Sequence, residues 1–204
     1  MERRISAVKV AICIPCHGDA KAWFVESLAR LTTATMKSSR GLELETFVCK
    51  GSRIHEVRNT LHGWAKGWQA DYVLWIDADQ TFPRDALLRL LLHKLPVVGA
   101  NIRWRTEEIV PTALVEGSGG KLEPILTTAD KASQGPEEVS SMGLGLCLVD
   151  MAIPVGDSPF VMGENGEDRP YFGKLRAAGA KIYVDHALSL EVGHIHETIL
   201  TFPR

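Results

Sequence analysis

The feature that most constrains this chain is the alternation of two apolar patterns along its first half. Short runs rich in β-branched and apolar residues occupy positions 8–15, 42–49, 72–76 and 96–102. Segments with apolar residues three and four positions apart separate them, at 20–33, 54–68 and 86–94. The first pattern is typical of strands and the second of amphipathic helices. Because strands that alternate with helices are joined by right-handed crossovers, we expect an α/β fold with a mainly parallel central sheet flanked by helices.

The second half of the chain is less regular. Residues 116–141 are rich in Gly, Ser, Thr, Lys and Glu, which predicts a hairpin and a mobile loop. Further strands are expected at 144–149 and 181–185, with a helix at 168–178 that ends at Gly179. Because 204 residues suffice for one substantial domain, we expect a single domain over 1–204, with a small antiparallel part in its second half.

The formal net charge is -2, so no overall positive field draws the chain to nucleic acid or to an anionic membrane. Scattered surface arginines are favoured over a local basic groove formed by Arg53, Arg58, Arg84, Arg103 and Arg105. No apolar stretch reaches the roughly 18 residues needed to cross a bilayer. The apolar N-terminal run contains Lys9 and lacks a cleavage site, so we interpret it as a strand and expect a cytoplasmic protein.

Cys13 and Cys16 form a C-x-x-C pair, a spacing found in zinc and redox sites. Zinc would need a second closely spaced pair, and Cys49 and Cys147 are isolated. Cys13 also lies inside a predicted strand, whereas an activated redox thiol normally lies where a helix begins. Buried or pocket-lining cysteines are therefore the favoured interpretation.

Asp77 and Asp79 follow directly after the apolar run YVLWI. In an extended segment, residues two positions apart point to the same side. Ligands of open α/β sheets bind beyond the carboxyl ends of the strands, which is where these carboxylates are expected. Mg²⁺ and Mn²⁺ take oxygen ligands and share carboxylates with substrate phosphates. The pair predicts a metal and diphosphate site; the alternative is that Asp77 ends the strand and Asp79 caps the next turn.

Two further groups with chemical potential lie in the second half. Glu167 and Asp168 stand where a helix is expected to begin, so they either stabilise its N-terminus or supply a general base for a hydroxyl group. His194 and His196 lie two positions apart, and imidazole suits Mn²⁺ better than Mg²⁺. We favour His194 as the third metal ligand.

Three residues of the first half are also candidates. Arg58 lies on a predicted helix after a Gly-Ser turn, and its planar guanidinium suits a diphosphate; the alternative is a solvated helix face. His17, at the tip of the first strand, edges a nucleobase pocket or is an ordinary turn residue. The tryptophans are expected mostly in the core, with substrate stacking as the alternative for Trp104.

Taken in order, these segments resemble the GT-A-fold glycosyltransferases, in particular the small soluble family-two-like enzymes of bacteria and phages. AICIPCHG is similar to their first strand and nucleotide loop, and GSRIHEVRNTL to their glycine–serine turn and Arg-Asn helix. DYVLWIDADQTFPRDALLRLL resembles the metal-binding D-x-D segment with the helix that follows it. SMGLGLCLVD is similar to the glycine-containing strand beside the acceptor. GEDRPYFGKLRAAGAKIYVDHALSLEVGHI resembles the acidic pair, helix, final strand and late histidine.

The resemblance implies a GT-A (Rossmann-like) fold and the metal-dependent, inverting transfer of a sugar from a nucleotide-sugar to a hydroxyl acceptor. Residues 1–105 would bind the donor and 106–204 the acceptor. Asp77, Asp79 and His194 would hold Mn²⁺ or Mg²⁺, and Asp168, with Glu167 beside it, would be the base. The donor would contact Pro15, Cys16, His17, Arg58, Asp77, Ala78 and Asp79.

The implied donor is a UDP-sugar, with a GDP-sugar as the alternative, although FVCKGS lacks the family's usual acidic residue for uracil. The implied acceptor is a soluble hydroxyl compound, with a modified nucleobase in DNA as one candidate, in a bacterium or an infected host cell. The loop at 116–141 is expected to close over the donor. A sugar nucleotidyltransferase is a weaker alternative, because PCHGDAKA is a poor match to a Gly- and Arg-rich phosphate loop. The other alternative is a non-catalytic module that binds a nucleotide-sugar.

Overall fold

The computed structural model describes residues 7–39, 41–106, 108–196 and 199–200. Its helices are α1 (Ala22–Ser38), α2 (Ile54–Gly67), α3 (Ala86–Leu92), α4 (Ala129–Ala132), α5 (Asp168–Ala177) and α6 (His186–Ser189), with a 3-10 turn η1 (Ser118–Gly120). Its strands are β1 (Val8–Cys16), β2 (Leu42–Lys50), β3 (Tyr72–Ile76), β4 (Gln80–Thr81), β5 (Val97–Gly99), β6 (Leu114–Glu116), β7 (Leu122–Pro124), β8 (Glu137–Val139), β9 (Leu146–Asp150), β10 (Ile182–Val184), β11 (Gly193–Ile195) and β12 (Ile199–Leu200).

Seven strands form the central sheet, in the order β2-β1-β3-β9-β5-β10-β8. Five of them run in one direction: β1 pairs in parallel with β2 and β3, and β5 pairs in parallel with β10. The other two, β9 and β8, run the opposite way. The expected mainly parallel α/β sheet is therefore confirmed. A small antiparallel sheet of β12, β11 and β4 joins the C-terminal segment to the residues that follow β3.

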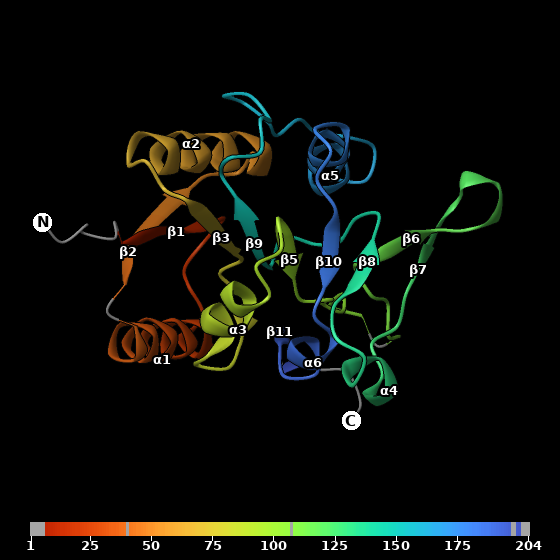
Figure 1. Ribbon diagram of the computed structural model, residues 1–204, viewed down its shortest axis with the longest axis horizontal. Coiled ribbons are helices and arrows are strands. Elements are labelled where there is room, and N and C mark those ends of the chain that lie inside the picture. Colours follow the sequence, from red (N-terminus) through yellow and green to blue (C-terminus); the bar gives the residue numbers. More distant parts are fainter. Residues whose placement is uncertain (1–6, 40, 107, 197–198, 201–204) are drawn as a thin grey trace, which may run out of the picture.

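Helices cover both faces of the central sheet, so the molecule has three layers (Figure 1). On one face, α2 and α5 pack in a core cluster that includes Cys13 and Trp75 of the sheet. On the other face, α1, α3 and α6 pack in a cluster that includes Ile12 and Leu74. Because neighbouring residues of β1 and β3 point to opposite faces and both faces are covered, these strands are continuous apolar runs in the sequence.

The elements predicted for the first half are present, but some bounds and burials differ. The helix expected at 20–33 runs from Ala22 to Ser38, because neither Gly nor Pro interrupts the chain before Gly41. The strand expected at 96–102 is confined to Val97–Gly99. Trp64 was expected in the core, yet it is exposed and packs against Phe47 of β2. Since β2 is an edge strand of the sheet, a side chain that lies over it keeps one side in solvent.

The strand predicted at 144–149 is β9, and it lies antiparallel between β3 and β5. Glycines allow its close approach: a Cβ at Gly99 would lie 2.6 Å from the carbonyl oxygen of Leu146. A Cβ at Gly145 would lie 2.6 Å from Cδ1 of Ile102 and 3.3 Å from Oδ2 of Asp77. Because β9 runs opposite to its neighbours, it begins at the edge where they end. The backbone N–H of Asp77 accordingly donates to the carbonyl of Gly145 at 3.1 Å.

Residues 116–141 contain more regular structure than the sequence predicted. The expected hairpin is present as β6 and β7, which project from the rest of the molecule (Figure 1). The remainder is not one long loop, because it contains α4 and then β8, which pairs with β10 at the end of the central sheet. This region therefore extends the sheet on the side away from β1 and β2.

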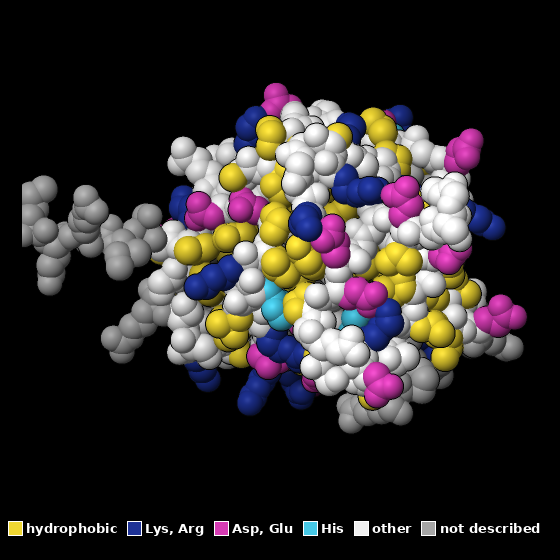
Figure 2. Space-filling view, turned by 45° about the vertical axis from the view of Figure 1, so that its right-hand side comes forward, with side chains coloured by type: hydrophobic (Ala, Val, Ile, Leu, Met, Phe, Trp, Pro, Cys, Tyr) yellow, Lys and Arg dark blue, Asp and Glu magenta, His cyan; other side chains and the backbone are white. Residues whose placement is uncertain are grey.

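Charged side chains of both signs are interspersed with apolar patches on the face that Figure 2 shows. The arginines considered for a basic groove separate accordingly: Arg53 pairs with Glu56 on α2 at 2.7 Å, whereas Arg58 is buried. Arg105 instead reaches Asp79. In the described part of the chain, no helix is both long enough and apolar enough to span a bilayer.

Candidate active site

A cavity of about 570 Å³ lies at the carboxyl ends of β1 and β3, where open α/β sheets bind their ligands. Its lining includes every residue that the sequence proposed for the donor, the metal and the base: Pro15, Cys16, His17, Arg58, Asp77, Ala78, Asp79, Glu167, Asp168 and His194. These residues come from segments far apart in the chain, so their convergence is a product of the fold.

Asp79 lies between a histidine and an arginine. Its Oδ2 is 3.4 Å from Nε2 of His194 and 3.1 Å from Nη1 of Arg105. Burial raises the pKa of Asp79, but His194 and Arg105 outweigh that effect, so the pKa is lowered overall. The other nitrogen of His194, Nδ1, lies 2.9 Å from the carbonyl oxygen of Arg103. A carbonyl only accepts, so this bond places a proton on Nδ1, and Nε2 is the nitrogen that faces Asp79.

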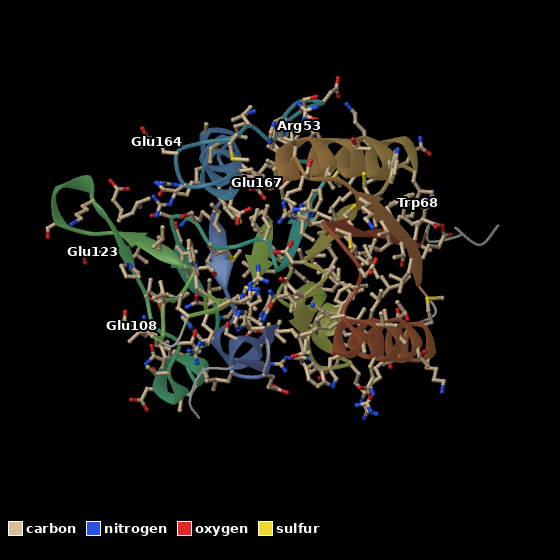
Figure 3. The ribbon with its side chains drawn as sticks, turned by 180° about the vertical axis from the view of Figure 1, so that it is seen from behind. Arg53, Trp68, Glu108, Glu123, Glu164 and Glu167 are labelled. Carbon is tan, nitrogen blue, oxygen red and sulfur yellow. The ribbon has the colours of Figure 1, made fainter. Side chains whose placement is uncertain are left out.

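Arg58 joins the two acidic segments. Its guanidinium donates from Nη2 to Oδ1 of Asp77 at 2.9 Å and from Nε to Oε1 of Glu167 at 2.8 Å. The Arg58 side chain is only 3% exposed, so it is not the solvated residue that one reading of its helix allowed. Burial alone would lower the pKa of Arg58, but Asp77, Asp168 and Glu167 raise it above its usual range. The arginine is therefore permanently charged. Its partner Glu167 lies between α2 and α5 (Figure 3).

Asp168, the first residue of α5, is a carboxylate of strongly altered acidity in the cavity. Burial raises its pKa to about 7, against the opposing effect of Arg58, and Glu167 and Asp77 add to the rise. The backbone N–H of Leu144 donates to it, whereas its Oδ1 is buried and has no hydrogen-bond partner within the described residues. A carboxylate of this kind can accept a proton near neutral pH.

The residue after Arg58 fixes the chain that leads to this carboxylate. Asn59 donates from Nδ2 to the carbonyl of Phe160 at 2.8 Å and accepts from the Phe160 N–H at 2.9 Å. The ring of Phe160 stacks on Tyr171 of α5 and meets Trp75 of β3 edge-on. Arg58 and Asn59 together therefore hold α5, and with it Asp168, in a fixed position relative to β3.

The loop after β1 forms another side of the cavity. Pro15, Cys16 and His17 line it, and the backbone N–H of Lys21 donates to the carbonyl of Ala78 at 3.4 Å. Cys13 lies earlier in β1 and is fully buried. Burial raises the pKa of its thiol to about 12. Because this pKa keeps the Cys13 thiol protonated at neutral pH, Cys13 is a core cysteine, as predicted, and not a redox centre.

The sequence predictions omitted some contributors and misplaced one segment. Arg105 was considered only for a basic groove, and Lys21 and the Leu144 N–H were not considered, although Arg105 and Lys21 line the cavity. The segment 116–141 was expected to cover the donor, but it supplies no residue to this lining. Its strand β8 pairs with β10 at the end of the central sheet. A signal for Arg105 was present in its position after a strand that ends at the same edge.

The donor set is suited to a divalent metal at two of its three predicted positions. Ligands about 2.1 Å from an octahedral ion lie about 3 Å apart, near the 3.4 Å between Asp79 and His194. The bond from His194 to a backbone carbonyl is typical of metal-bound histidines. The third, Asp77, is turned toward Arg58, and within the described residues no three His, Cys, Asp or Glu side chains converge as a metal site. Asp79 and His194 would therefore supply two ligands to such an ion and leave its other positions open.

No protein-family model matches this chain, and no curated protein matches its sequence. Solved structures do resemble it. Protein A197 from STIV superposes with a TM-score of 0.62 at 13% identity, covering 93% of this chain and 86% of that one. The catalytic domain of Drosophila beta1,4galactosyltransferase 7 with xylobiose superposes with a TM-score of 0.55 at 16% identity, covering 93% of this chain and 71% of that one.

A mutant of the Drosophila enzyme, in complex with manganese, UDP-Gal and xylobiose, gives the same scores. The chain has a GT-A-like fold. The fold that the sequence segments implied is thereby confirmed.

Proposed function

We propose that this chain is a metal-dependent glycosyltransferase that moves a sugar from a nucleotide-sugar to a hydroxyl acceptor with inversion. The observation that carries the proposal is the position of Asp168, whose pKa of about 7 suits a base, in the same cavity as Asp77, Asp79 and His194. We call this cavity the donor cavity. A base and a diphosphate-binding edge in one cavity are the parts that glycosyl transfer needs.

The proposed reaction is a single displacement. The acceptor oxygen forms a bond to the anomeric carbon while the bond from that carbon to the diphosphate oxygen breaks. Asp168 takes the hydroxyl proton, and the diphosphate leaves with the electron pair. Asp168 is favoured over Glu167 as the base because Glu167 already accepts a bond from Arg58, whereas Oδ1 of Asp168 has no partner within the described residues.

The remaining side chains bind and position. Asp79 and His194 would hold the divalent ion, with Asp77 as the third ligand, and the bound ion would neutralise charge on the leaving diphosphate. Lys21 and Arg105 line the same cavity and would be available to neutralise a diphosphate bound there. Arg58 is a positioning residue, since its bonds to Asp77 and Glu167 set the geometry of both acidic segments.

The nature of the substrates is part of the proposal. We favour a UDP-sugar donor, with a GDP-sugar as the alternative, and Mn²⁺ over Mg²⁺ because His194 supplies a nitrogen ligand. The similar Drosophila structure contains manganese and UDP-Gal, which supports the same choice. The acceptor is proposed to be a soluble hydroxyl compound, and the reaction to occur in the cytoplasm of a bacterium or an infected host cell.

A thermal-shift panel of UDP- and GDP-sugars, each with and without Mn²⁺, tests this function. We expect one donor to raise Tm by several degrees in the presence of Mn²⁺ and to have little effect without it. Asp79→Ala should remove the metal-dependent part of the shift while leaving the Tm of the free protein near that of the wild type. A panel with no shift would rule out the donor site. A shift without transfer or hydrolysis would indicate the non-catalytic module.

A further inference from the structure

A second cavity, of about 310 Å³, adjoins the donor cavity. Asp168 lines both cavities and is the one residue that the two linings share in the described part of the chain. The two cavities also have sequence neighbours in their walls, since Trp104 lines the second cavity and Arg105 lines the donor cavity. In a displacement the base touches the acceptor hydroxyl while that hydroxyl attacks the donor sugar. The second cavity therefore lies where an acceptor has to lie.

The walls of the second cavity are mostly apolar, and its polar lining residues are Thr112, Ser141, Asn165, Asp168 and Arg169. Trp104 and Pro111 contribute from the turn that follows β5, Leu122 and Pro124 from β7, and Met142 from the segment before β9. Trp104 is 58% exposed, which contradicts the expectation of a core residue and leaves a large aromatic surface available for stacking. The volume is at the lower end of the range for small-molecule sites, so the group that it holds is small.

Two polar atoms at this cavity have no partner within the described residues. They are Oγ of Ser141, whose residue is 4% exposed, and Oδ1 of Asp168. Buried polar atoms are normally hydrogen-bonded, so this pair indicates a ligand that supplies the missing partners. A ligand hydroxyl that donates a hydrogen bond to Oδ1 of Asp168 would direct its proton at the carboxylate that is proposed to remove it. Thr112 offers less, because its Oγ1 already accepts from the N–H of Ile102 at 3.2 Å.

We propose that this second cavity, the acceptor cavity, takes a hydroxyl carried on a small flat ring of low polarity, such as a benzyl-type or hydroxymethyl-heterocyclic alcohol. The proposal rests on the proposed function and adds the class of acceptor. A sugar ring carries hydroxyl groups on most of its carbons, and the polar lining residues (Thr112, Ser141, Asn165, Asp168 and Arg169) are outnumbered by apolar ones, so several of those hydroxyl groups would face apolar walls. A flat ring stacks on Trp104 and fits between prolines, and it presents one hydroxyl to Asp168.

The test compares two acceptors and a matched pair of tryptophan variants. Transfer from UDP-Gal and from UDP-glucose with Mn²⁺ is measured by mass spectrometry, with 4-nitrobenzyl alcohol and with xylobiose as acceptors. We expect kcat/KM for 4-nitrobenzyl alcohol to exceed that for xylobiose by about tenfold or more. Trp104→Ala should raise KM for the aryl alcohol about tenfold, and Trp104→Phe should largely restore it. Trp23→Ala, which removes an exposed indole that lines neither cavity, should change nothing.

Separate measurements distinguish failure of this proposal from failure of the proposed function. The Mn²⁺-dependent Tm shift with UDP should be the same in the wild type and in Trp104→Ala. Suppose that this Tm shift is present. If xylobiose is then the better acceptor, or if KM for the aryl alcohol is the same in Trp104→Ala and the wild type, the proposed acceptor class is wrong, while the proposed transferase function is unaffected. Calorimetric titration of 4-nitrobenzyl alcohol into the protein without donor gives a second arm. Binding to the wild type that is lost in Trp104→Ala supports the proposal, and no binding to the wild type overturns it.

Discussion

The donor cavity and the acceptor cavity share Asp168, yet they are built from opposite kinds of side chain. In the donor cavity several charges are paired before any ligand binds: Arg58 pairs with Asp77 and Glu167, and Arg105 pairs with Asp79. In the acceptor cavity the walls are largely apolar, and the polar atoms that point to a ligand are unpaired. One cavity is preorganised by ion pairs, and the other is completed by its ligand.

This difference determines what a substitution should change. Removing a member of the buried ion-pair network leaves an uncompensated charge, so the effect appears in the stability of the free protein. Removing part of an apolar wall leaves the charges intact, so the effect appears in KM for the acceptor. Asp168 belongs to both cavities, and its substitution should affect turnover and stability in opposite directions.

The largest effect is expected for Asp168→Asn. The amide cannot accept the acceptor proton, so kcat should fall roughly 10²–10⁴-fold, while the Mn²⁺-dependent Tm shift with the donor is retained. The folded-state pKa of Asp168 is raised, so the folded protein binds this proton more tightly than the unfolded chain does. The contribution of Asp168 to stability should therefore be lost as pH rises from about 4 to about 7, and Asp168→Asn should have the higher Tm at pH 8.

Glu167→Gln is the matched control for that substitution. If Asp168→Asn keeps its turnover and Glu167→Gln loses it, the base is Glu167. If both variants keep turnover, neither carboxylate removes the proton, and the asymmetry between the cavities has no catalytic meaning.

The second effect contrasts the two arginines. Arg58→Ala should lower the free energy of unfolding by about 3–5 kcal/mol, because Asp77 and Glu167 lose their buried partner. Arg105→Ala removes an ion pair whose arginine side chain is 49% exposed, and should cost less than about 1 kcal/mol. Urea denaturation of both variants measures this, with Arg58→Lys as the variant that keeps the charge but loses the planar fork. Equal losses would mean that the donor cavity is not preorganised by Arg58.

The third effect separates the two late histidines. His194→Ala should weaken Mn²⁺ binding in the presence of UDP roughly 10–100-fold, because it removes the nitrogen that faces Asp79. His196 is exposed and does not line the donor cavity, so His196→Ala should bind Mn²⁺ like the wild type. Titration of Mn²⁺ followed by Tm gives both values. A weaker site in His196→Ala alone would assign the third ligand to that residue.

The smallest effect is the pH dependence of the wild type. A base with a pKa of about 7 loses its proton as pH rises, so kcat should increase through pH 7 and level off above it. Between pH 7 and pH 6 the rate should drop about fivefold. A profile that stays flat down to pH 5 would assign the proton transfer to a more acidic group.

Much of the donor cavity was predictable because it follows from local pattern and one rule of topology. The run YVLWI is buried on both faces, so it had to be a central strand, and Asp77 and Asp79 then had to lie at its carboxyl end. The same rule placed the loop after β1 at that edge. The late histidine and the acidic pair required the family resemblance, since neither has a local pattern that excludes a helix cap or a turn.

The parts that the sequence did not predict depend on partners far along the chain. An arginine in the middle of an amphipathic helix has the pattern of a solvated residue, and Arg58 is buried only because Asp77 and Glu167, the latter 109 positions away, neutralise it. Trp104 is a large aromatic residue of the kind usually found in the core. It is exposed because β5 ends at Gly99, before the loop that contains Trp104. The acceptor cavity is formed by turns and a hairpin, where apolar periodicity gives no signal.

The insertion of β9 between β3 and β5 also constrains the order in which the chain folds. Both of its neighbours precede it in the sequence, so each keeps an unpaired apolar edge until residue 150 has been synthesised. A nascent chain that ends near residue 105 would expose those edges to pairing with other chains. The two halves of the chain are therefore not folded in succession. On the ribosome, β3 and β5 of the first half can complete this pairing only after β9 of the second half has been synthesised.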